Sequence, residues 1–186
     1  MPKVYTRYGD AGQTGLLYGG RIDKDDPRAE ACGTVDEAVS AIGLGRSHSS
    51  DEQVRDVAMR LQRQLFTVGA ELATDAAHFD TFLRHFTPVV QDDVDELERR
   101  IDSLQEAFEL PRAFVIPGAS TASAALDMAR STLRRAERRA VSLMRNGYLR
   151  EDSLVIPYLN RAADLLFILA RYQDRHLPDE LLTGER

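Results

Sequence analysis

The hydrophobic positions of this chain recur at alternating steps of three and four residues over most of its length, which is the period of an amphipathic α-helix. Helix start and stop residues divide the pattern into segments at about 26–46, 51–73, 88–108, 120–146 and 152–175. No segment of useful length alternates with the period of a strand. We therefore predict an all-α fold, a bundle of about five helices, with a mixed α/β fold as the weaker alternative.

The first predicted helix carries an acidic residue beside its apolar face. Asp26 followed by Pro27 is a good helix start, although the capping-box pattern from Thr34 to Glu37 also allows Gly33 to mark a kink or the true start. An unpaired carboxylate at Asp36, at the edge of the core, would be costly. We therefore expect an arginine partner for Asp36, or a role that only complements the helix dipole.

Residues 1–25 are predicted to be an irregular, glycine-rich arm, because five of the 12 glycines fall there. Such a loop can turn backbone N–H groups towards an anion, with the hydroxyls of Thr6 and Thr14 as further donors. Asp10 is available to position a metal or a base. A flexible arm without a ligand explains the same composition equally well.

The predicted helix at 120–146 holds the most distinctive chemistry, five arginines within residues 129–140. On a helical wheel Ala129, Leu133, Ala136 and Ala140 share one face, and the edge of that face carries a stripe of Arg130, Arg134, Glu137 and Arg138. Arg135 and Arg139 fall on the other flank. Guanidinium groups at such a border suit bidentate binding of phosphate oxygens; the alternative is a solvated basic face with i,i+4 pairs to Glu137.

Two other segments are candidates for contact with a ligand. The apolar run from Phe114 to Ile116 is broken by Pro117-Gly118 and cannot continue a helix. On the last helix Asn160 and Asp164 are one turn apart, beside Arg161. They suit a polar ligand, or equally a hydrogen bond between helices.

Length and charge narrow the class of protein. At 186 residues we expect a single domain over 1–186, composed of the arm (1–25), the bundle (26–175) and a short frayed tail (176–186). A formal net charge of −6 argues against a dedicated nucleic-acid binder, and no apolar run is long enough to cross a membrane.

A single cysteine, Cys32, and no apparent signal peptide predict a cytoplasmic setting. His78 and His85 lack further ligands at metal spacing, so no transition metal is assigned.

Six segments taken together resemble one family, the propanediol-utilisation type of ATP:cob(I)alamin adenosyltransferase. They are Tyr5-Thr-Arg-Tyr-Gly-Asp-Ala-Gly-Gln-Thr, Lys24-Asp-Asp-Pro-Arg, Gly33-Thr-Val-Asp-Glu, Phe114-Val-Ile-Pro-Gly, Ala129-Arg with Arg134-Arg-Ala-Glu-Arg, and Tyr158-Leu-Asn-Arg-Ala-Ala-Asp. The chain departs from the family's usual residues at Tyr8, Cys32, Ala119, Asp127 and Ala163. None of these departures removes an arginine.

The resemblance implies transfer of the 5′-deoxyadenosyl group of ATP to the cobalt of cob(I)alamin, which forms adenosylcobalamin and releases triphosphate. It implies a homotrimer in which the arm of one chain closes over ATP held by the arginine helix of its neighbour. The nucleotide and its Mg²⁺, bound mainly through the phosphates, would contact Thr6, Arg7, Tyr8, Gly9, Asp10, Thr14, Gly15, Lys24, Arg134, Arg135, Glu137, Arg138 and Asn160. Asp36 would pair with Arg130 across the subunit contact, and Phe114 would face the corrin ring and help displace the lower axial ligand of cobalt.

The resemblance assigns catalytic roles to Arg134, Arg130, Asp36 and Phe114, and suggests a corrinoid reductase and a cobalamin-dependent enzyme as partners. Cob(I)alamin is itself a strong nucleophile, which agrees with the absence of a Ser-His or Cys-His arrangement in the sequence. Two other classes of function stay open at this point. One is a non-catalytic ATP- or corrinoid-binding sensor or chaperone with the same pocket, and the other is a helical module whose basic stripe binds an acidic partner or nucleic acid.

Overall fold

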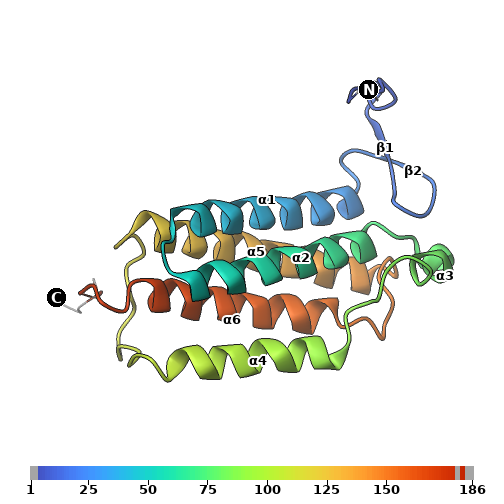
Figure 1. Cartoon of the computed structure of the whole chain (residues 1–186). Helices are drawn as coiled ribbons and strands as arrows, with labels where there is room; N and C mark the ends of the chain where they lie inside the picture. Colours follow the sequence, from blue (N-terminus) through green and yellow to red (C-terminus); the bar gives the residue numbers. More distant parts are fainter. Residues whose placement is uncertain (1–3, 179–180, 183–186) are drawn as a thin grey trace.

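The computed structural model describes residues 4–178 and 181–182, and its body is a bundle of long helices. In chain order these are α1 (Pro27–His48), α2 (Glu52–Leu72), α4 (Gln91–Gln105), α5 (Thr121–Arg145) and α6 (Val155–Gln173) (Figure 1). α1 packs on α5 and α2, α5 packs on α6, and α4 covers the outer side of α6. The predicted all-α bundle is confirmed. In the described residues no helix has both the length and the apolar surface needed to cross a membrane.

The first helix begins at the earlier of its two candidate starts. The Asp26 carboxylate accepts a hydrogen bond of 2.9 Å from the amide of Arg28, and the helix runs through Gly33 without interruption. The hydroxyl of Thr34 donates to the carbonyl of Glu30 at 2.7 Å, as hydroxyls in helix interiors do, and caps nothing. The alternative start at Gly33 is therefore wrong.

The loop after α2 contains more structure than the sequence indicated. A 3₁₀ turn, η1 (Ala76–His78), leads into a single helical turn, α3 (Phe79–Phe82). Phe82 is fully buried and stacks on Phe79 and Phe86, with ring centres 5.1 and 5.2 Å away. The following helix begins at Gln91 and not at Pro88, because the Asp93 carboxylate accepts a hydrogen bond from the amide of Val90 at 2.9 Å and fixes the start there.

The N-terminal arm is not wholly irregular, contrary to the prediction. It contains an antiparallel hairpin of β1 (Gln13–Gly15) and β2 (Arg21–Asp23), in register at Thr14 and Ile22. Strands of three residues are too short to show an alternating pattern in the sequence. Figure 1 shows that the arm projects beyond the N-terminal end of α1 and does not fold back along the helices. It is joined to the body at the α2–η1 connection, where the amide of Leu17 donates to the carbonyl of Ala73 at 2.9 Å.

The described part of the C-terminal tail is paired and not frayed. The amide of Leu182 donates to the carbonyl of Phe114 at 2.8 Å, and Leu181 bridges Val115 in antiparallel fashion. This pairing holds the backbone of the connection between α4 and α5. The prediction of a frayed tail is wrong at these positions, and for residues 179–180 and 183–186 it lies outside the described residues.

Small residues let α1 and α5 approach closely. A side chain at Gly45 would place its Cβ 2.9 Å from Cγ of Leu126 and 3.1 Å from the carbonyl oxygen of Ala122. Further along α5, Ala129, Ala136 and Ala140 are fully buried. The narrow inner face of α5 therefore sits directly against α1, and the charged residues that border this face lie close to the neighbouring helices.

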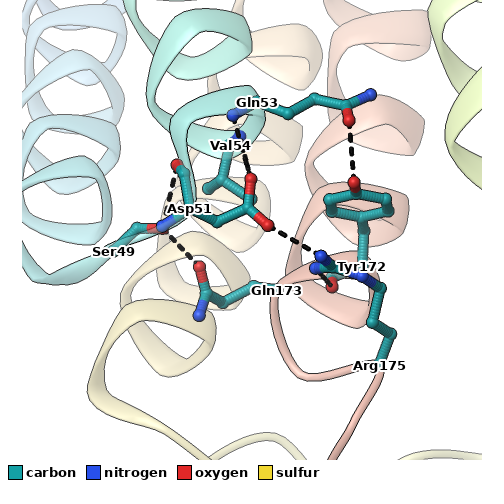
Figure 2. Close-up of polar contacts among 7 residues, drawn as sticks. All are labelled: Ser49, Asp51, Gln53, Val54, Tyr172, Gln173 and Arg175. Carbon is teal, nitrogen blue, oxygen red and sulfur yellow. Dashed lines mark hydrogen bonds and ion pairs between the residues drawn. The ribbon is translucent and has the colours of Figure 1, made fainter.

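A polar network fastens the end of the bundle at which α2 begins and α6 ends (Figure 2). The Asp51 carboxylate caps α2 through the amides of Gln53 and Val54, at 2.9 and 3.2 Å, and accepts a hydrogen bond from Arg175 at 2.9 Å. The Ser49 hydroxyl donates to the side-chain oxygen of Gln173 at 2.5 Å. Burial raises the pKa of Asp51, but the capping amides and the Arg175 guanidinium outweigh it, so that the net pKa lies below its ordinary value.

Loss of this carboxylate should destabilise the fold. We predict that Asp51→Ala lowers the free energy of unfolding by about 1–2 kcal/mol, because one helix cap and one half-buried partner of Arg175 are lost together. Urea unfolding at pH 7 measures the change. The depressed pKa means that this stabilisation is present above the unfolded pKa of about 3.9 and is lost as pH falls through the folded pKa. The difference between variant and parent should therefore shrink in acid.

Asp92→Ala is the matched control for this prediction. Asp92 lies in the first turn of α4, its side chain is 86% exposed, and it pairs with Arg99 at 3.5 Å. Its loss should change the free energy of unfolding by less than about 0.5 kcal/mol. Equal losses in the two variants would show that the Asp51 network does not fasten the bundle.

Candidate active site

The arginine stripe lies on α5 as the helical wheel predicted. Arg130, Arg134 and Arg138 occur at successive turns beside the buried face that includes Leu133 and Ala136. Arg130 is half-buried, whereas Arg134 and Arg138 are exposed. Nη1 of Arg138 donates to the carbonyl of Arg134 at 3.0 Å. In the described part of the chain no hydrogen bond or ion pair engages the Arg134 guanidinium, so its five donors are available to an anion.

The other flank of α5 is paired within the chain. Arg135 forms an ion pair with Glu37 of α1, and Arg139 lies 3.4 Å from Glu30. These side chains are all about half exposed, so each pair adds little to stability. The pairs do distinguish the arginines of α5 by charge compensation. Acids of α1 neutralise Arg135 and Arg139, whereas none neutralises Arg134 in the described chain.

Glu137 does not pair with the arginines of its own helix. Its Oε1 accepts a hydrogen bond of 3.0 Å from Nδ2 of Asn160 on α6. The i,i+4 pairs to Glu137 are therefore absent in the described chain, although Arg134 and Arg138 are exposed as in a solvated basic face. The hydrogen bond between helices proposed for Asn160 is present. The contact joins two of the predicted site residues and fixes the orientation of the Asn160 amide next to the stripe.

A recess of about 430 Å³ opens between α4, α5 and α6 beside Arg130. Phe114 borders it and is 82% exposed, which excludes a role as core filler. Arg161 lies in the same recess and bonds to Asp164 at 2.7 Å and to Glu98 at 2.9 Å. The remaining lining is mainly apolar and consists of Ile101, Gln105, Leu110, Phe167 and Ile168. The recess combines an apolar wall with a cation, which suits a large, mostly apolar ring that carries polar substituents.

The arm presents its predicted ligand residues towards solvent. Thr6, Arg7, Tyr8, Asp10, Gly15 and Lys24 are exposed, and Gly9 and Thr14 are half-buried. The sequence analysis missed the residue that organises this loop, Arg21, whose Nη2 donates to the carbonyls of Tyr8 at 2.5 Å and Gln13 at 3.2 Å. The signal available in the sequence was that Arg21 is a cation within a glycine-rich segment. Within one chain the arm projects beyond the N-terminal end of α1 (Figure 1).

Asp36 is exposed on α1 and borders a groove of about 570 Å³ between α1 and α5. No ion pair to Asp36 occurs within the described residues of the chain. Arg130 instead has its guanidinium carbon 5.4 Å from the ring centre of Phe167. The partner expected for Asp36 is therefore not found among the described residues of its own chain. Leu44 and Met128, 45% and 51% exposed, line the same groove.

The one cysteine of the chain is unsuited to nucleophilic catalysis. Burial and the nearby Asp36 carboxylate raise the pKa of Cys32 to about 12, so that the thiol stays protonated at neutral pH. This agrees with a site in which guanidinium groups stabilise the charge that develops and the substrate itself is the nucleophile.

Comparison with known proteins identifies the class to which this fold and site belong. The sequence model of the cobalamin adenosyltransferase family matches residues 4–173, so the chain belongs to that family. A corrinoid adenosyltransferase of Bacillus subtilis is 41% identical over 174 residues, which cover 91% of this chain and 85% of that protein. A corrinoid adenosyltransferase of Citrobacter freundii is 38% identical over 174 residues, 94% of this chain and 96% of its own.

Solved structures agree with the sequence relatives. A variant of the PduO-type ATP:corrinoid adenosyltransferase of Lactobacillus reuteri, complexed with cobalamin and ATP, superposes with a TM-score of 0.86 at 33% identity and covers 98% of this chain and 97% of that one. Another variant of that protein, complexed with ATP, gives a TM-score of 0.84 at 34% identity over 97% of this chain and all of that one. The particular relatives to which this chain is similar are thus PduO-type corrinoid adenosyltransferases.

The exposure of Phe114 leads to a prediction about stability. Phe114→Ala should change the free energy of unfolding by less than about 0.5 kcal/mol, since exposed substitutions rarely do more. The control is Phe82→Ala, in a fully buried aromatic stack, which should lose about 3–5 kcal/mol. Thermal or urea unfolding compares the two variants. A Phe114→Ala loss as large as that of Phe82→Ala would place Phe114 in the core.

Proposed function

We propose that this chain transfers the 5′-deoxyadenosyl group of ATP to the cobalt of cob(I)alamin, forming adenosylcobalamin and triphosphate. The observation that carries the proposal is the arrangement on α5, where the unpaired guanidinium of Arg134 lies one turn from Arg130 at the rim of the Phe114 recess. One helix thus offers an anion site beside an apolar recess. We assign ATP to the anion site and the corrinoid to the recess; this is supported by the family of the chain and by a PduO-type relative that is complexed with cobalamin and ATP.

The reaction needs no attacking side chain. The electron pair of cob(I)alamin attacks C5′ of ATP, the cobalt–carbon bond forms, and the C5′–O bond breaks with its electrons on the departing triphosphate. Negative charge accumulates on that leaving group, so pre-aligned cations are the groups that accelerate the step. Arg134, Arg138 and Lys24 are assigned this role, and proximity of the two bound substrates supplies much of the remainder.

Mg²⁺ fits the site as a companion of the nucleotide. The described residues contain no group of three or more His, Cys, Asp or Glu side chains that could hold a metal ion. The ion would therefore depend mainly on triphosphate oxygens, with Asp10 or Glu137 as the acids of the predicted set. When bound, it would neutralise part of the triphosphate charge.

The arm and the arginine stripe are proposed to meet between chains of a homotrimer. The arm projects away from its own bundle and presents Thr6, Arg7 and Lys24 to solvent. On α1, Asp36 has no ion-pair partner among the residues that the structure describes, and it borders a groove with the exposed apolar side chains of Leu44 and Met128. An unpaired carboxylate beside exposed apolar surface supports a subunit contact at this groove, in which Arg130 of a neighbouring chain pairs with Asp36.

Phe114 is proposed to face the corrin ring and to help displace the lower axial ligand of cobalt, which makes cobalt easier to reduce. Its exposure at the recess supports this role. A corrinoid reductase would supply the reduced cobalamin and a cobalamin-dependent enzyme would take up the product. We place the reaction in the cytoplasm, where a lone protonated cysteine such as Cys32 is stable.

An anaerobic assay tests the function directly. The purified protein is mixed with ATP, Mg²⁺ and chemically reduced cobalamin, and adenosylcobalamin and triphosphate are measured. Stoichiometric formation of both products is the expected result. Binding of ATP and cobalamin without turnover would instead identify a non-catalytic sensor or chaperone.

Arg134 should contribute to the rate and not only to ATP binding. Arg134→Lys keeps the charge but loses the planar fork, so a bidentate contact to the phosphates becomes a point contact. We predict a loss in kcat of about ten- to a thousandfold, within the range for one pre-aligned donor, with little change in the KM for ATP. Arg139→Lys, on the opposite flank and paired with Glu30, is the matched control and should keep the parental rate. A change confined to KM would reduce Arg134 to a binding residue.

Asp36 should matter for assembly. Asp36→Asn keeps the shape of the side chain but removes the charge that we pair with Arg130 of a neighbouring chain, and stranding one partner of a buried pair costs several kcal/mol, about 3–5. Sedimentation equilibrium should show a weakened trimer, accompanied by loss of turnover. Glu52→Gln, an exposed acid in the first turn of α2, is the control. A variant at Asp36 that assembles and turns over like the parent refutes the pairing.

A further inference from the structure

A buried ion pair that the proposed reaction does not use joins α5 to α6. The carboxylate of Asp127 accepts a hydrogen bond from Nη2 of Arg171, and the two side chains are only 8% and 6% exposed. Burial of two charges costs about as much as their attraction returns, and well-packed apolar residues would stabilise such a position at least equally. Overall stability is therefore a weak explanation for this pair.

The pair is connected to the recess through one aromatic ring. The guanidinium carbon of Arg171 lies 5.5 Å from the ring centre of Phe167, and that of Arg130 lies 5.4 Å from the same centre. Phe167 and Arg130 both line the recess that Phe114 borders. Guanidinium groups at this range are attracted by the ring quadrupole, so the place of the ring affects both arginines.

Asp127 also acts on the stripe by its charge. It precedes Arg130 by three residues on α5, which places the two side chains on the same side of the helix. Burial raises the pKa of Asp127, and the Arg171 and Arg130 guanidiniums oppose that effect. The carboxylate therefore interacts with both arginines that approach Phe167.

A second carboxylate competes for Arg171. Asp174 follows it by three residues on the same segment, and within the described residues both carboxylate oxygens of Asp174 are buried without a hydrogen-bond partner. If Asp127 loses its charge, the Arg171 guanidinium has an unpaired acceptor nearby. A shift to Asp174 would keep the charge compensated while moving the guanidinium away from its place between Asp127 and Phe167.

We propose that Asp127 and Arg171 are positioning residues for Arg130. The pair holds the Arg171 guanidinium against Phe167, and the ring in turn holds the Arg130 guanidinium at the rim of the recess. The Arg130 side chain is then already in the rotamer that faces the corrinoid side of the site. This inference rests on the proposed function, because it assigns Arg130 to the working site.

Asp127→Asn is the central variant, since it keeps the shape of the side chain and removes its charge. We expect kcat/KM for cob(I)alamin to fall about tenfold while KM for ATP stays within about twofold, because only the corrinoid side of the stripe is disturbed. Asp174→Asn is the matched control: it removes a carboxylate from the same cluster but leaves the Asp127–Arg171 pair in place, and it should keep the parental kcat/KM. Melting temperatures are measured for every variant.

A double-mutant cycle separates positioning from general damage. In an Arg130→Gln background, Asp127→Asn should lower kcat/KM by less than about twofold, because the group it positions is already gone. Phe167→Leu, which keeps the ion pair and removes the ring, gives a second cycle with the same expectation should Asp127→Asn prove unstable. Losses that multiply in both cycles overturn the inference.

The parental protein in the same assay distinguishes failure of this inference from failure of the proposed function. If it forms adenosylcobalamin and the losses multiply, the proposed function stands and this inference is wrong. If it forms no product, the proposed function fails and the inference fails with it.

Discussion

The close packing of α1 against α5 is the constraint on which the other features of this molecule depend. A Cβ added at Gly45 of α1 would lie 3.1 Å or less from Leu126 and from the carbonyl oxygen of Ala122 on α5. Several alanines further along α5 are fully buried. A wider inner face on α5 would separate the helices and bury part of the stripe. Because the face is narrow, Arg130 lies at its border, half-buried, while Arg134 and Arg138 extend into solvent from the same edge.

The same packing divides the charges of α5 into two groups with different roles. Towards α1, Arg135 and Arg139 are neutralised by Glu37 and Glu30. Towards α6, Asn160 holds Glu137, and Asp127 holds Arg171. In the described chain the Arg134 guanidinium has no hydrogen bond, ion pair or ring contact, whereas Arg138 bonds to a backbone carbonyl and Arg130 approaches the Phe167 ring. In a protein with a formal net charge of −6, a free guanidinium beside an apolar recess is a local exception that suits a strongly anionic ligand.

The period of the hydrophobic residues predicted the long helices and the faces that they bury. It located the long helices and placed the stripe of α5 at the edge of the core, because both follow from which residues share a helical face. It missed the hairpin in the arm, whose strands of three residues carry no repeating pattern. It also missed Asp127, Arg171 and Arg21, since a wheel assigns a residue to a face but does not reveal its partner on another element. For Arg171 a signal was present, a lone cation amid the apolar residues 165–172.

The central claim of this account is that the arm of one chain completes the arginine stripe of another, and subunit complementation tests it most directly. Lys24→Ala and Arg134→Gln chains carrying different affinity tags are co-expressed, and oligomers with both tags are isolated and assayed for adenosylcobalamin. In a mixed ring of three chains one contact joins an intact arm to an intact stripe, so we predict about one third of the parental activity, although each variant alone is nearly inactive. Mixed oligomers no more active than the separate variants would contradict the account, because arm and stripe would then belong to the same chain.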